Sequence, residues 1–190
     1  MKIAVLSLAA ALALPAAAQG PGTAAPPAAP AANPAVTGLK GPWNRVKDLL
    51  VRAAEKMPEE NYAFKASPDV RSFGQLVGHV ADANFMFAAM AAGEKPAPRD
   101  IEKTKTSKAD LVAALKESFA AADKAFAQTD ADLATATKMF GMDTNRFAVV
   151  GLLIGHDWEH YGNLVTYLRI KGVVPPSSEP RPEAAKAPAK

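Results

Sequence analysis

Residues 149–168 read VVGLLIGHDWEHYGNLVTYL, and this stretch decides the fold. Its apolar side chains recur at spacings of three and four residues, as they do on the buried face of an α-helix. On a helical projection they form one broad arc, made of Val149, Val150, Leu153, Ile154, Leu164, Val165 and Leu168. We therefore predict a long helix that begins near Thr144 and ends at Ile170 or Lys171.

Three further segments show the helical period, and each is bounded by residues that start or stop helices. Ser72 is followed three positions later by Gln75, which is the capping-box pattern, and Gly93 ends that segment. Ser107 begins another segment in a similar way. No segment shows the alternating period of strands, so we predict an all-α fold, a four-helix bundle. The three additional helices are expected at residues 37–57, 72–92 and 107–126.

The first 18 residues have the features of a Sec-type signal peptide. Lys2 supplies a positive charge, residues 3–14 are apolar, and residues 16–18 are three alanines. We expect cleavage after Ala18 and a periplasmic or secreted protein. The apolar run is shorter than the roughly 20 residues that a spanning helix needs, so we expect no stable membrane insertion after cleavage.

Two segments have a composition that disfavours folding. Residues 19–36 consist mostly of alanine, proline and glycine, and residues 175–190 are rich in proline, alanine and lysine. Such segments bury too little apolar surface to offset the entropy of ordering them. We therefore expect a flexible leader at residues 19–36, a folded domain at residues 37–174 and a disordered tail at residues 175–190.

The composition also excludes some classes of function. The chain has no cysteine, which excludes disulfides and catalysis by a thiol of the protein itself. The net charge is +3, and basic and acidic residues are interspersed in the predicted domain, so we expect no nucleic-acid partner. A small molecule is then the expected substrate, and a homodimer is an open possibility.

The chain contains three histidines, His79, His156 and His160. Residues four apart on a helix differ by about 40° in direction and about 6 Å in rise, so His156 and His160 project side by side. On the helical projection of the last helix, His160 lies within the apolar arc and His156 lies at its edge. On that of residues 72–92, His79 lies at the margin of the apolar arc. Since buried polar groups need partners, we expect the three imidazoles to bind one divalent metal ion. The alternative is that they are hydrogen-bonded core residues.

The type of ion follows from the ligands. Three imidazoles suit Zn, Ni, Co or Fe(II). A structural zinc site normally has four protein ligands, and no cysteine is present to complete one. Three ligands would leave coordination positions open for water or substrate.

Two motifs of this sequence resemble those of the DinB/YfiT-like superfamily. Residues 155–168 are similar to its last helix, which commonly carries His-Glu-x-x-His-Arg-Gly-Gln. Residues 78–84, Gly-His-Val-Ala-Asp-Ala-Asn, are similar to its earlier Gly-His-x-x-Asp/Glu motif. The resemblance implies a four-helix bundle that carries a divalent metal ion on His79, His156 and His160.

The resemblance does not imply one reaction. Members with assigned activities include transferases that use bacillithiol or mycothiol and a maleylpyruvate isomerase. This chain differs from the common pattern at Asp157, Tyr161 and Asn163, where glutamate, arginine and glutamine are frequent in the family.

Asp157 is the candidate catalytic residue. It projects near the middle of the apolar arc of the last helix, where a carboxylate is costly unless it meets a donor or a cation. It could orient a histidine or move a proton to or from metal-bound water, and the alternative is a salt bridge or hydrogen bond to another helix. Glu159 projects toward the polar face, and we expect it to be solvated.

These features favour a periplasmic metal-dependent enzyme, either a hydrolase or a group transferase. The three-histidine site would activate water or a thiol or oxygen of the substrate. The alternative is a non-catalytic periplasmic bundle that binds a metal or another ligand.

Overall fold

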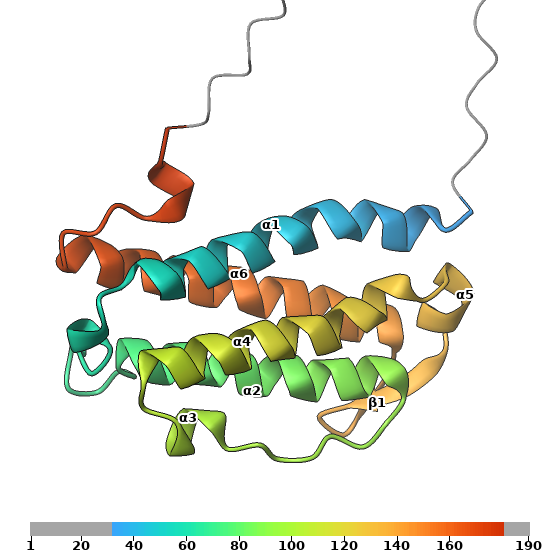
Figure 1. Cartoon of the computed structure of the whole chain (residues 1–190). Coiled ribbons are helices and arrows are strands. Elements are labelled where there is room, and N and C mark those ends of the chain that lie inside the picture. The colour runs from blue at the N-terminus through green and yellow to red at the C-terminus, as the bar shows by residue number, and fades with distance from the viewer. Residues whose placement is uncertain (1–31, 181–190) are drawn as a thin grey trace, which may run out of the picture. The chain divides into compact units, whose positions relative to one another are not determined.

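Four long helices form the body of the protein. The computed structural model describes residues 32–180. The long helices are α1 (Pro34–Lys56), α2 (Phe73–Ala92), α4 (Lys108–Asp123) and α6 (Arg146–Ile170), and they lie alongside one another (Figure 1). The predicted all-α four-helix bundle is confirmed.

The ends of the long helices depend on local side chains. Ser72 accepts a hydrogen bond from the backbone N–H of Gln75, and the Gln75 side chain accepts one from Ser72, which completes the predicted capping box. Gly93 ends α2 with a φ of 78°, a left-handed conformation that glycine adopts without steric cost. Asn145 caps α6, so this helix begins two residues after the predicted Thr144.

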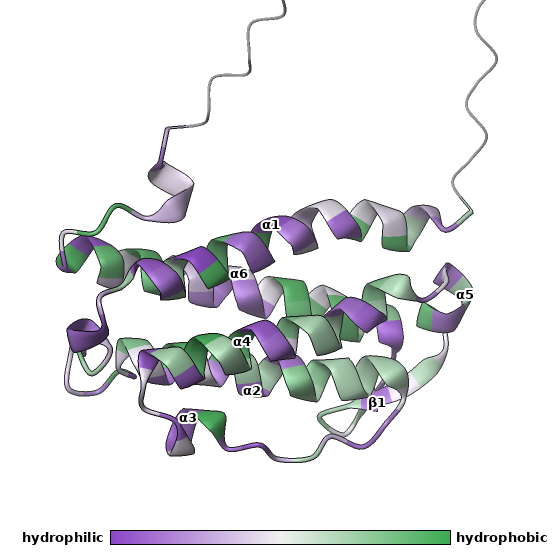
Figure 2. Ribbon diagram, in the orientation of Figure 1, coloured by the Kyte–Doolittle hydropathy of each residue, from purple (hydrophilic) through white to green (hydrophobic). Residues whose placement is uncertain are grey.

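The core lies between the long helices. Hydrophilic and hydrophobic residues alternate around α1, α4 and α6, so that each helix has an apolar face (Figure 2). Trp43 of α1 is buried against two aromatic rings, with centroid distances of 5.4 Å to Phe119 and 4.7 Å to Phe126. Leu153 and Leu164 of α6 are fully buried in the same core.

Short elements connect the long helices. One is a hairpin that the sequence did not predict, in which β1 (Ala136–Met139) pairs antiparallel with β2 (Met142–Asn145). Most side chains of both strands are exposed, so the sequence lacks the apolar alternation that identifies a half-buried strand. The remaining elements are η1 (Glu59–Asn61), α3 (Ile101–Thr104), η2 (Lys124–Ala127), α5 (Asp130–Leu133) and η3 (Pro176–Ser178).

Ordered contacts extend a few residues beyond the predicted limits of the folded domain, residues 37 and 174. At the start, Val36 is buried, and its backbone N–H donates to the carboxylate of Asp130 at 2.9 Å. At the end, Pro176 is buried, and Glu179 forms ion pairs with Arg52 and Lys56. Composition predicted disorder at these positions because it does not register contacts with distant residues.

The predicted signal peptide at residues 1–18 lies outside the described residues, as do residues 19–31 of the leader and residues 181–190 of the tail. Within residues 32–180, none of the helices combines the length and the apolar character that crossing a membrane requires.

Adjacent leucines of α6 offer a test of this packing. Leu153 is fully buried and Leu152 is 39% exposed. Leu153→Ala is expected to lower the free energy of unfolding by about 2–5 kcal/mol, because it leaves a cavity in the core. Leu152→Ala should cost less than about 1 kcal/mol, since part of its side chain already contacts water. Chemical denaturation of both variants checks this. Equal losses in the free energy of unfolding would contradict the burial of Leu153 in the core.

Candidate metal centre

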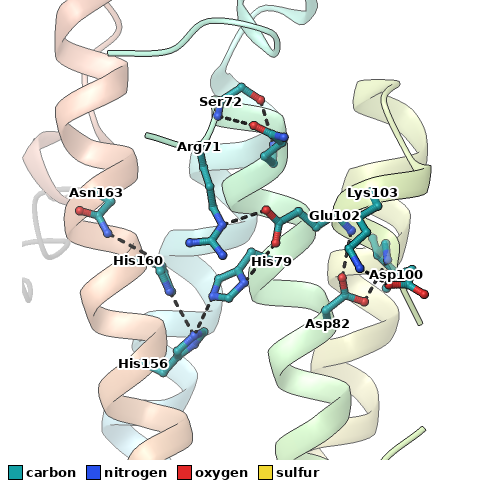
Figure 3. A network of polar contacts seen from close by, with 12 residues as sticks. Arg71, Ser72, His79, Asp82, Asp100, Glu102, Lys103, His156, His160 and Asn163 are labelled. Carbon is teal, nitrogen blue, oxygen red and sulfur yellow. Dashed lines mark hydrogen bonds and ion pairs between the residues drawn. The ribbon is translucent and has the colours of Figure 1, made fainter. Parts of the chain in front are cut away.

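The structure brings the three histidines together from two helices. His79 extends from α2, and His156 and His160 extend from α6 (Figure 3). Nε2 of His156 lies 3.2 Å from Nε2 of His79 and 3.1 Å from Nε2 of His160. One nitrogen from each ring falls within 4.8 Å of the others, so a single ion between them could contact all three.

The surroundings keep two of these imidazoles neutral. His160 is buried, and this burial, together with the nearby His156, His79 and Arg71, lowers its pKa to about 4. Burial also lowers the pKa of His79, assisted by the charges of Arg71 and His156 and opposed by the carboxylate of Glu102. A neutral imidazole is the form that donates a lone pair to a metal, so both rings are available as ligands near neutral pH.

Carboxylates lie beside the outer nitrogens of two histidines. Oε2 of Glu102 is 3.3 Å from Nδ1 of His79, and Oδ1 of Asp157 is 3.8 Å from Nδ1 of His156. A carboxylate beside Nδ1 favours the tautomer that carries its proton there. With the proton at Nδ1 in both rings, the Nε2 atoms of His79 and His156 present lone pairs that face each other at 3.2 Å. Two lone pairs at that distance repel unless a cation lies between them, so the donor set fits a metal ion.

The third histidine has an amide neighbour. Nδ2 of Asn163 lies 3.4 Å from Nδ1 of His160, one turn away on α6. Each of the three imidazoles therefore has a different polar side chain near its Nδ1 atom, and among the described residues Nδ1 of His156 has no hydrogen-bond partner.

Glu102 was missed by the sequence analysis, although its position depends on a motif that the sequence shows. Gly78 is so close to α3 that a Cβ there would lie 2.7 Å from Cα of Glu102. The carboxylate of Asp82 accepts the backbone N–H groups of Ile101 and Glu102 at 3.0 and 2.9 Å. Gly78 and Asp82 flank His79 in the Gly-His-x-x-Asp motif, so one stretch of α2 supplies a histidine and holds α3 beside it.

The signal that could have indicated Glu102 was weak. Residues 93–106 lie between two predicted helices and were expected to be a connection, and the Ile101–Thr104 helix within them is only one turn long. Arg71 was missed as well, and its Nε donates to Oε1 of Glu102 at 2.9 Å. Its guanidinium therefore holds the other oxygen of the carboxylate that faces His79.

Asp157 is completely buried next to the cluster. Burial raises the pKa of its carboxyl group to about 6, against a smaller opposing effect of His156. Neither carboxylate oxygen has a hydrogen-bond partner among the described residues, so the predicted alternative of a hydrogen bond to another helix is not seen. Glu159 is exposed, as expected.

Two clefts reach the histidine cluster. One has a volume of about 630 Å³, is lined by His160 and Asn163, and carries the charged side chains of Lys65, Arg71 and Glu159. The other has a volume of about 680 Å³ and is lined by His79 and His156. Neither cleft is lined by Asp157.

Comparison with known proteins identifies the family. A family model described as the DinB superfamily matches residues 43–164, which include all three histidines. The chain belongs to the DinB superfamily. A comparison with curated protein sequences gives no match.

Solved structures of DinB-like proteins have the same fold as this DinB superfamily member. A DinB-like protein from Bacillus cereus ATCC 10987 has a TM-score of 0.66 and 18% identity, over 74% of this chain and 95% of its own. A DinB-like protein from Bacillus subtilis, YjoA, has a TM-score of 0.58 and 24% identity, over 74% of this chain and 92% of its own. At these identities the similarity establishes the fold.

A pair of glycine substitutions tests how α3 is held. Gly78→Ala is expected to lower the free energy of unfolding by about 1–3 kcal/mol, because the added Cβ would overlap the backbone of Glu102. Gly151→Ala in α6 meets nothing within 4 Å, so it should instead stabilise the protein by about 0.4–1 kcal/mol. Denaturation measurements on the two variants check this, and stabilisation by both would show that the close approach at Gly78 is absent.

Proposed function

We propose that this protein is a divalent-metal-dependent enzyme, a hydrolase or a group transferase, whose metal ion is bound by His79, His156 and His160. The observation that carries the proposal is the convergence of three Nε2 atoms, with 3.1 and 3.2 Å between neighbouring atoms. The family and the fold are compatible with it. Zn, Ni and Fe(II) all suit three imidazoles.

The accessibility of the site supports catalysis over a purely structural metal. In the described part of the chain, the cluster of candidate metal ligands has three members, one short of a closed zinc site. One cleft is lined by His160, and the other is lined by His79 and His156. A small molecule therefore has access to the site. A bound ion of this kind supplies Lewis acidity that activates water or a thiol or oxygen of the substrate.

The polar neighbours have separate tasks in this proposal. Glu102 holds the proton of His79 at Nδ1, and Arg71 in turn fixes the Glu102 carboxylate. Asp157 acts on His156 from a fully enclosed position. Because Asp157 lines neither cleft, we propose that it orients His156, which is one of its two predicted roles, and that it does not exchange protons with substrate.

Metal content tests the proposal directly. The untagged protein is expected to contain about one divalent ion per chain by elemental analysis, or to take up one ion of Zn, Ni or Fe(II) after purification. His156→Ala should reduce this content to near zero, because the central imidazole of the three is lost. The proposal fails if the wild-type protein contains no metal and binds none of these ions.

The role of Glu102 has its own test. Glu102→Gln is expected to weaken metal affinity by about 10- to 100-fold, because the amide favours the Nδ1 proton of His79 less than the carboxylate does. Glu117→Gln on the exposed face of α4 is the matched control and should leave the affinity unchanged. Competition with a chromogenic chelator measures both values. Equal affinities in the two variants would exclude Glu102 from the site.

A further inference from the structure

We propose that the cleft beside His79 and His156 binds an aromatic or aliphatic group of the substrate, and that Phe140 is its outer wall. This inference rests on the proposed function, since the other end of such a substrate would contact the metal. It adds a substrate class to the site: a small molecule that joins a metal-binding head to an uncharged apolar group.

The cleft has the size and composition of a small-molecule site. Its volume of about 680 Å³ is within the usual range for such sites. Its lining comes from α2, α3 and the segment before it, the turn of the hairpin, and α6. The larger apolar residues of the lining are Met86, Phe87, Pro96, Pro98, Phe140 and Leu152.

The charged residues of this cleft already have partners within the protein. Asp82 accepts two backbone N–H groups of α3. Lys103 and Asp100 form an ion pair at 2.9 Å. The guanidinium of Arg99 lies 3.7 Å from the ring centroid of Phe85, a cation–π contact. The surface that is left to recognise a ligand is therefore mainly apolar.

Phe140 has an unusual backbone conformation. Phe140 and Gly141 are the two turn residues between the paired Met139 and Met142, with φ values of 52° and 83°. Two successive positive φ values are typical of a type I′ turn, in which asparagine, aspartate or glycine is preferred. A phenylalanine there costs free energy, and such outliers occur at ligand-binding sites. The ring is 59% exposed, so burial in the core does not compensate for this cost.

The apolar lining of the cleft is continuous with the histidine cluster. The ring of Phe87 contacts both Phe140 and His156. Its centroid lies 6.4 Å from the ring centroid of Phe140 and 5.7 Å from that of His156. An aromatic or aliphatic group resting on Phe140 and Phe87 would thus extend directly toward His156. The other cleft carries Lys65, Arg71 and Glu159, so the polar parts of a substrate belong on that side.

Two probes with the same metal-binding head separate this inference from the proposed function. Acetohydroxamate and benzohydroxamate differ by the replacement of a methyl group with a phenyl ring. Isothermal titration calorimetry of the zinc-loaded protein is expected to give about 10- to 100-fold tighter binding of benzohydroxamate, from burial of the ring. Metal-free protein serves as the blank.

Three variants test which residues cause the preference for benzohydroxamate over acetohydroxamate. Phe140→Asn keeps a residue that tolerates a left-handed backbone but removes the ring, so the preference for benzohydroxamate should fall at least about fivefold. Leu152→Gln, on the α6 side of the cleft, should act in the same direction. Met142→Asn is the control, because Met142 is 61% exposed and does not line the cleft. Acetohydroxamate affinity should be similar in all three variants.

Each contrary outcome has a distinct meaning. Equal binding of the two probes by the wild-type protein, or an unchanged preference in Phe140→Asn, would overturn the inference and leave the metal site intact. Binding of neither probe would contradict the open coordination position and, with it, both proposals. Sedimentation of a wild-type dimer that Phe140→Asn converts to a monomer would show that a second copy covers the cleft, which also overturns the inference.

Discussion

The packing of α2 against α6 brings His79 against His156 and His160, and the arrangement of the rest of the site depends on this contact. An imidazole removed from water loses its hydrogen bonds with solvent, and each of these rings is at least partly buried. The rings face one another through their Nε2 atoms, and polar side chains lie near their Nδ1 atoms. A cation among the Nε2 atoms would bind the lone pairs that otherwise repel. The packing of the two helices therefore favours a positive charge at their interface.

The neighbourhood of His79 illustrates how closely fold and site are coupled. Gly78 permits α3 to approach α2, Asp82 binds the first backbone N–H groups of α3, and Glu102 of α3 then reaches His79. These three interactions begin from one turn of α2. The glycine that precedes the histidine in this motif therefore has a steric function. It allows a carboxylate more than 20 residues later in the chain to lie beside the histidine.

The two clefts give the histidine cluster two chemically different sides. The His160 side carries exposed charged groups, whereas the His79 and His156 side is bordered by aromatic rings and prolines. The hairpin contributes Phe140 to the apolar side from a strained turn, and α6 contributes Leu152 directly next to the core residue Leu153. The lining of the apolar cleft and the packing of the core thus share one helix, but they use different faces of it.

The sequence by itself determined the four helices, most of their ends and the side-by-side placement of His156 and His160, because helical period and capping are local properties. It also predicted that His79 joins this pair in one cluster, and the structure brings the three rings together. Only the tertiary structure shows that Glu102 and Arg71 lie beside the cluster and that Phe140 borders a cleft. Those contacts join residues far apart in the chain. In addition, the sequence shows no periodic pattern in the exposed hairpin or in the one-turn helix α3. The same reason explains the domain boundaries, where the positions of Val36 and Pro176 depend on burial against distant helices.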